Sequence, residues 1–348
     1  MKTVAANTTD GTPIGLASSS ALCGERLFLV DPRNAVVHEI RLSDGQRIKT
    51  FGHGGDPAGS LRSPESVIAD CDGNSVVVQD GGSLLHYEMN STAFIRRTKR
   101  APTAGPALGF ASMDGKAAVF PGYWVTDRAA LSREPAHALN GFSIGYRVDL
   151  GDSGASTPLL PLITDGCRSM SSNCLDVGID KLAESKGGWI ACQGGGSPLV
   201  GVYSTSGELQ RRVDTRSPLF LDDGTTAAAS ATVSSKIQWH QRNSAVRFCA
   251  AFDDYIVTVH YTLEPGEWSP GKAMPPRALM NIHGLDGTPI SADIALRDVP
   301  VAKDGHNLYV LVYGESRKNS GGARLELDTI QITDENGNLN GQLRRLGG

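Results

Sequence analysis

Short apolar runs of strand length alternate with polar turns along most of the chain. Leu27–Val30, Val76–Val78 and Tyr309–Val312 are three such runs. Asp-Gly and Asn-Gly pairs, which supply the positive-φ residues of tight hairpins, follow or precede many of them. Helical spacing is nearly absent, apart from a short helical turn that we expect near Ile179–Glu184. The pattern therefore predicts an all-β fold of many short strands.

Two segments of this pattern align with each other. Leu22–Asp31 and Asp70–Asp80 each read as a polar turn, an apolar strand and a terminal aspartate, and each is followed by two further strand-like runs. The terminal residues Asp31 and Asp80 are 49 positions apart. A period near 50 with about four strands per unit is typical of a β-propeller blade.

The junction between the two segments resembles that of NHL repeats. It runs from Phe51-Gly through a Gly-rich loop to Pro64 and a short strand ending in Asp70, and the Asp72-Gly-Asn turn and second strand follow. The chain is thus similar to six-bladed propellers of the NHL and TolB-like type over residues 14–98, and the similarity fades after them. This resemblance implies a six-bladed β-propeller of four-stranded antiparallel blades.

We expect a single domain, 1–348, with six repeat units and with residues 1–13 helping to close the ring. The last unit would end on a strand at Leu339–Arg345. Seven blades would need a repeat hidden in 151–186 or 214–244. The six expected blades are 14–53, 54–98, 105–150, 175–214, 243–296 and 297–346.

Six cysteines permit three disulfides. Cys23 and Cys71 hold the same position in consecutive repeats and so could face each other across adjacent blades. Cys167 and Cys174 could close a Ser-rich loop, whereas Cys192 and Cys249 lie in apolar runs typical of buried free thiols. At least one disulfide would place the protein in an oxidising compartment, and we expect a secreted or periplasmic protein whose signal peptide is absent.

Charge and hydropathy exclude several classes of partner. The net charge is −4 and the densest basic cluster, residues 96–100, is confined to one turn or strand end, so we expect no nucleic-acid binding. No apolar stretch reaches the ~20 residues that cross a bilayer, so we expect no membrane span. We expect a monomer.

Four segments exceed the usual loop lengths and are the natural place for a site: 121–140, 151–186, 214–244 and 262–276. On a propeller they would decorate one rim and narrow the mouth of the central channel. Tyr123, Trp124 and Trp268 fall in them and could stack on sugars, peptides or aromatic ligands, or anchor their own loops. Trp239 and His240 form a further candidate pair for binding, with Arg242 close by.

Arg62 and Glu65 flank Pro64 at the entrance to an inner strand. By the resemblance, residues there lie near the channel mouth, and a carboxylate so placed could bind calcium or act as an acid or base. We therefore take Arg62 and Glu65 as binding candidates, Glu65 as the candidate metal ligand, and Glu65, His240 and Arg247 as candidate catalytic residues. No cofactor is predicted, and calcium is an alternative.

Two local motifs carry little weight. Gly151-Asp-Ser-Gly154 matches part of a serine-protease motif, but the third glycine and an upstream histidine segment are missing. Gln193-Gly-Gly-Gly lacks the Lys-Ser/Thr of a phosphate-binding loop.

Three functional hypotheses remain. The leading one is a non-catalytic propeller that holds a small molecule, glycan or peptide at its channel mouth. The alternatives are a six-bladed hydrolase or lyase of the lactonase or esterase kind, with an axial acid/base or metal site, and a protein-interaction platform.

Overall fold

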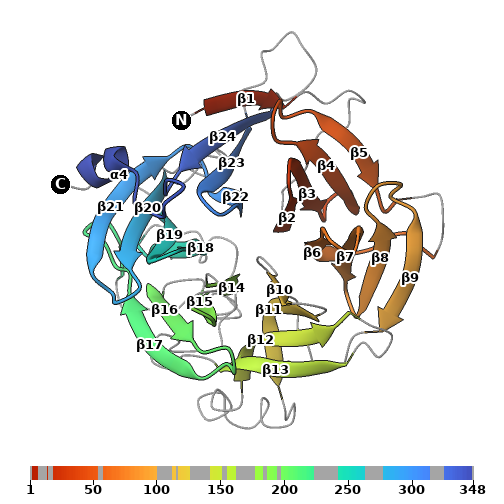
Figure 1. The fold of residues 1–348 in the computed structure, drawn as a ribbon, viewed down its shortest axis with the longest axis horizontal. Coiled ribbons are helices and arrows are strands. Elements are labelled where there is room, and N and C mark those ends of the chain that lie inside the picture. The colour runs from red at the N-terminus through yellow and green to blue at the C-terminus, as the bar shows by residue number, and fades with distance from the viewer. Residues whose placement is uncertain are drawn as a thin grey trace. The chain divides into compact units, whose positions relative to one another are not determined.

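The structure is a computed structural model of the 348-residue chain (Figure 1). It describes residues 2–6, 14, 19–53, 58–99, 112–114, 117–125, 142–150, 155–161, 177–182, 186–193, 197–222, 242–262, 277–313 and 325–346. Within these ranges nearly every residue in a regular element belongs to a strand, as the alternating pattern predicts.

The strands form six four-stranded antiparallel sheets, so the fold is a six-bladed β-propeller, as predicted. Blades 1 and 2 comprise β2 Ser19–Cys23, β3 Arg26–Asp31, β4 Val36–Arg41 and β5 Arg47–Phe51, then β6 Pro64–Asp70, β7 Ser75–Asp80, β8 Ser83–Glu88 and β9 Phe94–Lys99. Blades 3 and 4 comprise β10 Ser112–Asp114, β11 Ala117–Val125, β12 Phe142–Asp149 and β13 Ser156–Pro161, then β14 Val177–Lys181, β15 Trp189–Gln193, β16 Leu199–Tyr203 and β17 Leu209–Asp214. Blades 5 and 6 comprise β18 Ala245–Phe252, β19 Tyr255–Thr262, β20 Arg277–Gly284 and β21 Pro289–Leu296, then β22 Pro300–Lys303, β23 Asn307–Tyr313, β24 Leu325–Gln331 and β1 Lys2–Ala6.

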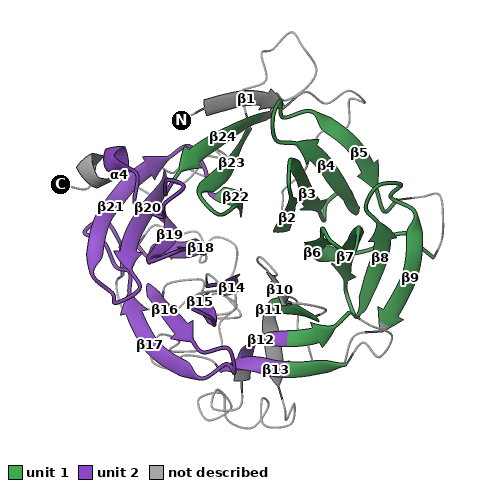
Figure 2. Cartoon of the chain, in the orientation of Figure 1, with its two compact units in different colours: residues 1–120, 147–157, 300–331 green, residues 121–146, 158–299, 332–348 purple. Residues whose placement is uncertain are grey.

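The chain divides into two compact units, which are coloured separately in Figure 2. Unit 1 comprises residues 1–120, 147–157 and 300–331, and therefore contains blades 1, 2 and 6. Unit 2 comprises residues 121–146, 158–299 and 332–348, and therefore contains blades 4 and 5. Blade 3 contributes residues to both units.

Blade 6 does not end as the sequence pattern suggests. The strand expected at Leu339–Arg345 is wrong, because Gly341–Leu346 forms the short helix α4 in unit 2. The Asn340 side chain accepts a hydrogen bond from the Gln342 backbone amide at 3.0 Å, the contact of a helix N-cap. The fourth strand of blade 6 is instead β1, which pairs antiparallel with β24 in unit 1.

The segment 151–186, expected as a long loop, contains strands. Residues 151–186 include β13 and β14, and the helical turn expected near Ile179–Glu184 is wrong because β14 runs through Lys181. Pairing with β15 buries Ile179, and the Asp180 carboxylate accepts a hydrogen bond from the Ala251 amide of β18 at 2.7 Å. Tertiary pairing thus overrides the weak local signal of this segment.

The core of unit 1 contains two apolar clusters and a buried polar network. Phe28 and Val30 pack with Val67 and Val78 of blade 2, and Leu27 packs with residues of blade 6. His38 is fully buried in blade 1: its Nε2 lies 3.1 Å from Oδ2 of Asp31, and its Nδ1 lies 3.1 Å from Oγ1 of Thr50. Both ring nitrogens therefore have protein partners, which is the usual condition for burying a polar ring.

The core of unit 2 lies between blades 4 and 5. Ile190, Val202 and Val213 of blade 4 pack with Val246 and Ile256 of blade 5. Phe220 belongs to the same cluster and lies in the segment that follows β17. Burial of this apolar surface is the main force that holds the two blades together.

One disulfide joins consecutive blades in each unit. Cys23 and Cys71 are bonded, with 5.5 Å between their Cα atoms, as the aligned repeats predict. Cys192 and Cys249 are bonded as well, with 6.1 Å between their Cα atoms, so the interpretation of these two as free thiols is wrong. The strands β15 of blade 4 and β18 of blade 5 lie against each other and bring the two cysteines together, although both lie in apolar runs. Cys167 and Cys174 lie outside the described residues.

None of the helices among the described residues is long and apolar enough to cross a membrane.

Candidate functional site

Glu65 and Arg62 lie at the start of the inner strand of blade 2. Glu65 accepts a hydrogen bond from the Gln79 side chain, and Ser66 Oγ donates to the Oε1 atom of the same glutamine at 3.3 Å. The Arg62 side chain is exposed, while its backbone amide donates to Oδ1 of Asp80 at 3.0 Å. The two candidates therefore lie beside a polar network whose described contacts hold the strand entrance in place.

Glu65 is not part of a recognisable metal-binding cluster. Within the part of the chain that the structure describes, no group of three or more His, Cys, Asp or Glu side chains is placed to hold a metal ion. Calcium requires six to eight oxygen ligands. The described residues around Glu65 do not by themselves supply this set of oxygen ligands.

The other candidates belong to other blades or lie outside the described residues. Arg247 is exposed on β18 in unit 2, at a bulge between Val246 and Phe248. Tyr123 and Trp124 belong to β11 rather than to a long loop, which corrects that expectation. Trp239, His240 and Trp268 lie outside the described residues.

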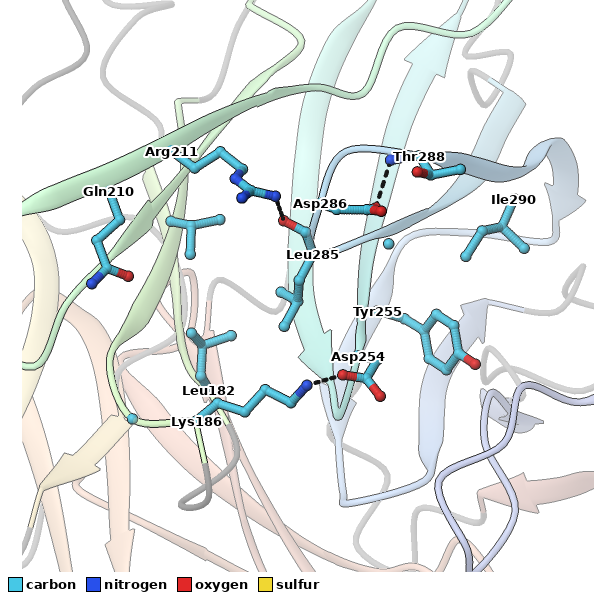
Figure 3. A pocket seen from close by; sticks show the side chains of 13 residues that line it. Leu182, Lys186, Gln210, Arg211, Asp254, Tyr255, Leu285, Asp286, Thr288 and Ile290 are labelled. Atoms are coloured by element: carbon cyan, nitrogen blue, oxygen red, sulfur yellow. Dashed lines mark hydrogen bonds and ion pairs between the residues drawn. The ribbon is translucent and has the colours of Figure 1, made fainter.

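A groove in unit 2 is a concave site formed by described residues. It lies between blades 4 and 5, where the loop after β14, the strand β17 and the turns that follow β18 and β20 come together (Figure 3). Its volume is about 690 Å³, within the range of ~300–1,000 Å³ that is usual for ligand sites. The residues that line it are Leu182, Lys186, Gly187, Val202, Gln210, Arg211, Asp254, Tyr255, Gly284, Leu285, Asp286, Thr288 and Ile290.

The floor and the rim of the groove differ in chemistry. Leu182 and Val202 are almost fully buried, and together with Leu285 and Ile290 they give the groove an apolar floor. Tyr255, which follows the turn between β18 and β19, adds an aromatic ring to the wall. An apolar floor with an aromatic ring can bury part of a ligand, while polar groups at the rim fix its orientation.

Charges of both signs stand at the rim. The Lys186 ammonium of blade 4 forms an ion pair with the Asp254 carboxylate of blade 5 (Figure 3). The Arg211 guanidinium donates to the Leu285 carbonyl at 3.4 Å, a long hydrogen bond that leaves most of its donors available to a ligand. The groove therefore presents cations from blade 4 and carboxylates from blade 5.

Asp286 is held in its charged form by its own turn. Its Oδ1 accepts a hydrogen bond from the Thr288 amide at 2.9 Å, and this contact is the main reason why the pKa of Asp286 lies below its ordinary value. Arg211 lowers the pKa of Asp286 further. The carboxylate is thus negatively charged at physiological pH, and the Arg211 cation is near enough to stabilise that charge.

Sequence reasoning missed this groove. Its charged residues are scattered from Lys186 to Asp286, and no two of them form a motif. The pairs Asp253-Asp254 and Asp286-Gly predict turns at this place, and a turn signal indicates a hairpin rather than a ligand site. The groove exists because blades 4 and 5 pack side by side, which no short sequence pattern reports.

No family model matches the sequence, and no curated protein matches it. Solved structures are similar in fold. A member of the DUF4221 family from Bacteroides vulgatus aligns over 95% of this chain and 97% of its own, with a TM-score of 0.67 and 10% identity. A Bacteroides fragilis protein named as a candidate exported protein aligns over 95% of this chain and 94% of its own, with a TM-score of 0.58 and 10% identity. At this level of identity the likeness concerns the fold alone.

Proposed function

We propose that this chain is a non-catalytic binding protein of the periplasm or cell exterior, and that it holds a short extended peptide in the groove between blades 4 and 5. The observation that carries the proposal is the groove itself: an apolar floor under a rim with Arg211 on one side and Asp286 on the other. Small molecules and glycans stay as alternative ligands for the same site.

The strand beside the groove favours a peptide. β17 is the terminal strand of its sheet, and its residues Gln210 and Arg211 line the groove. A terminal strand has one edge available for main-chain hydrogen bonds, and extended peptides commonly bind by adding a strand to such an edge. A peptide with an acidic and a basic residue could then pair with Arg211 and Asp286 in one defined direction.

Two observations support the proposed location. Both units contain a disulfide between consecutive blades, and such bonds persist mainly in oxidising compartments. The exported-protein candidate of similar fold is consistent with the same compartment.

A peptide titration tests the proposal. The probes are end-capped octapeptides with alternating apolar residues and one Asp–Arg or Arg–Asp pair, measured by calorimetry against a glycan set. We expect one charge order to bind better than the other, and Arg211→Ala to weaken that binding about tenfold, or ~1.4 kcal/mol. Arg212→Ala is the matched control, because Arg212 is the next residue of β17 and does not line the groove.

Three results would count against this function. They are binding that is equally sensitive to both arginine substitutions, glycan binding that is independent of Arg211, and an absence of binding by all peptides of both charge orders.

A further inference from the structure

A second feature of unit 2 lies outside the proposed groove and shares no residue with it. The segment Thr215–Asp222, here called the strap, follows β17 and lies against the outer strands of blade 5. Thr215 accepts a hydrogen bond from the Asn281 side chain at 3.2 Å through its carbonyl, and the Leu219 amide donates to Oδ2 of Asp293 at 3.3 Å. The Phe220 ring lies 5.2 Å from the His260 ring, measured between centroids.

The face of blade 5 beneath the strap is polar and buried. Asn281 and Thr258 are directly opposite each other on β20 and β19, and His260 lies two residues beyond Thr258, so all three side chains share one face. Buried side-chain atoms without a hydrogen-bond partner concentrate among the described residues of this region. They are Ser217 Oγ, Thr258 Oγ1, His260 Nε2, His283 Nδ1 and Asp293 Oδ1. Buried polar atoms are normally bonded, so a cluster of exceptions calls for an occupant.

Hydrogen bonds fix which atoms of this cluster donate. The Asp293 backbone amide can only donate, and it lies 2.8 Å from Oδ1 of Asn281, which identifies that atom as the amide oxygen. The two protons on Asn281 Nδ2 then point to the Thr215 carbonyl and to His260 Nδ1, at 3.2 and 3.3 Å. His260 Nδ1 is therefore an acceptor, and the ring carries its proton on Nε2.

The resulting donor has no direct acceptor. His260 Nε2 and Asp293 Oδ1 are 4.0 Å apart, too far for a hydrogen bond, and neither atom has another hydrogen-bond partner. The His260 side chain is 2% exposed, so bulk solvent does not satisfy it. Burial keeps the ring neutral by lowering the pKa of His260 to about 4, with Asp293 acting in the opposite direction.

A gap of this size suits one oxygen atom that accepts from the histidine and donates to the carboxylate. Two hydrogen bonds of ~2.8 Å that meet at roughly a right angle span 4.0 Å. Asp293 has a positive φ of 55°, a conformation that is uncommon for residues other than glycine and in which Asp and Asn are enriched. The backbone is therefore held in an uncommon conformation at the residue that supplies the acceptor.

We propose that His260 Nε2–H and Asp293 Oδ1 form a binding site for a single water molecule, which joins β19 to β21 and fixes the Asp293 carboxylate that accepts the hydrogen bond of the strap's Leu219 amide. The water accepts a proton from the histidine and donates one to the carboxylate, so both unpaired atoms gain a partner. Asp293 then contacts the strap through Oδ2 and the water through Oδ1. The strap and the outer strands of blade 5 are expected to open and close together.

A crystal structure of the full chain tests the site directly. We expect an isolated peak of water density about 2.7–3.2 Å from both His260 Nε2 and Asp293 Oδ1. His38 and Asp31 in blade 1 serve as the internal control, because their direct 3.1 Å contact leaves no gap for a water. Empty space, a direct His260–Asp293 hydrogen bond or another protein atom in the gap would overturn the proposal.

A solution experiment gives an independent readout. In protein labelled with 15N-histidine, we expect the neutral Nε2–H tautomer of His260 and a cross-peak from that proton to a long-lived water. His260→Leu should increase deuterium uptake by the strap severalfold, whereas His86→Leu in blade 2 should leave strap uptake unchanged. An Nδ1–H tautomer, or equal strap uptake in the wild type and His260→Leu, would contradict the proposed water site.

Discussion

Two buried histidines, His38 in unit 1 and His260 in unit 2, have different degrees of hydrogen bonding. His38 contacts Asp31 and Thr50 directly, so both of its ring nitrogens are satisfied. His260 contacts Asn281 through one nitrogen and faces Asp293 across 4.0 Å with the other. Protein atoms alone complete the hydrogen bonds of His38, whereas those of His260 are completed only by the proposed water.

The largest loss of stability is expected from removing the disulfides, one of which lies in each unit. We expect Cys192→Ala with Cys249→Ala, and separately Cys23→Ala with Cys71→Ala, each to lower the free energy of unfolding by about 4 kcal/mol, because both bonds close long loops. Cys192 and Cys249 are 2% exposed, so their removal also leaves a cavity and should cost more than removal of the unit 1 pair. Urea unfolding of both double variants measures this. A larger loss of unfolding free energy in the Cys23/Cys71 variant than in the Cys192/Cys249 variant would contradict this expectation.

A smaller effect separates the histidines themselves. We expect His38→Leu to lower the free energy of unfolding by about 3 kcal/mol, because it removes two direct hydrogen bonds, one to the buried Asp31 carboxylate and one to Thr50. His260→Leu should cost only about 1 kcal/mol, since one of its nitrogens has no direct protein partner. Denaturant midpoints of the two variants at pH 7 provide the measurement. Equal losses of unfolding free energy in the two variants would mean that the hydrogen bonds of His38 and His260 are equally complete.

The smallest effect is a pH dependence. Burial lowers the pKa of His260 to about 4, and burial followed by the Arg96 charge lowers that of His86 to about 4. Because both rings are neutral in the folded protein and take up protons on unfolding, they contribute stability that is full above pH ~6.5 and is lost as the pH falls towards 4. We expect each histidine to contribute about 2 kcal/mol to this loss.

Unfolding curves at several pH values between 4 and 7 check this dependence. His86→Leu and His260→Leu should each flatten the fall in stability, and the double variant should flatten it most. A wild-type protein whose stability is constant over this range would exclude the proposed burial of neutral rings.

The sequence predicted blades 1 and 2 well because their signals are local. Asp72-Gly specifies a turn, Val76–Val78 specifies a buried strand, and the alignment of Cys23 with Cys71 predicts a bond between neighbouring blades. These features depend on residues that are close in sequence, or on a repeat that makes distant residues equivalent.

The remaining features depend on contacts between distant segments. Apolar surroundings favour a free thiol and a buried disulfide equally, so Cys192 and Cys249 were misread. Residues 339–345 have the apolar spacing of a short strand, yet the Asn340 cap begins a helix there. The groove combines residues from blades 4 and 5, and the water site combines residues from two strands of blade 5. The NHL-like similarity of residues 14–98 fades before either blade begins.

The pairing of β1 with β24 has a consequence for how the protein is made. Val4 is opposite Leu327, so β1 finds its partner β24 only after the strands of blades 1 to 5 have been synthesised. Folding rates fall as the sequence separation of contacts grows, and unpaired strand edges attract other chains in the meantime. Blades 1 and 2 can complete all four of their strands from local sequence during synthesis. Blade 6 cannot, because β1 has no partner strand until β24 has been synthesised.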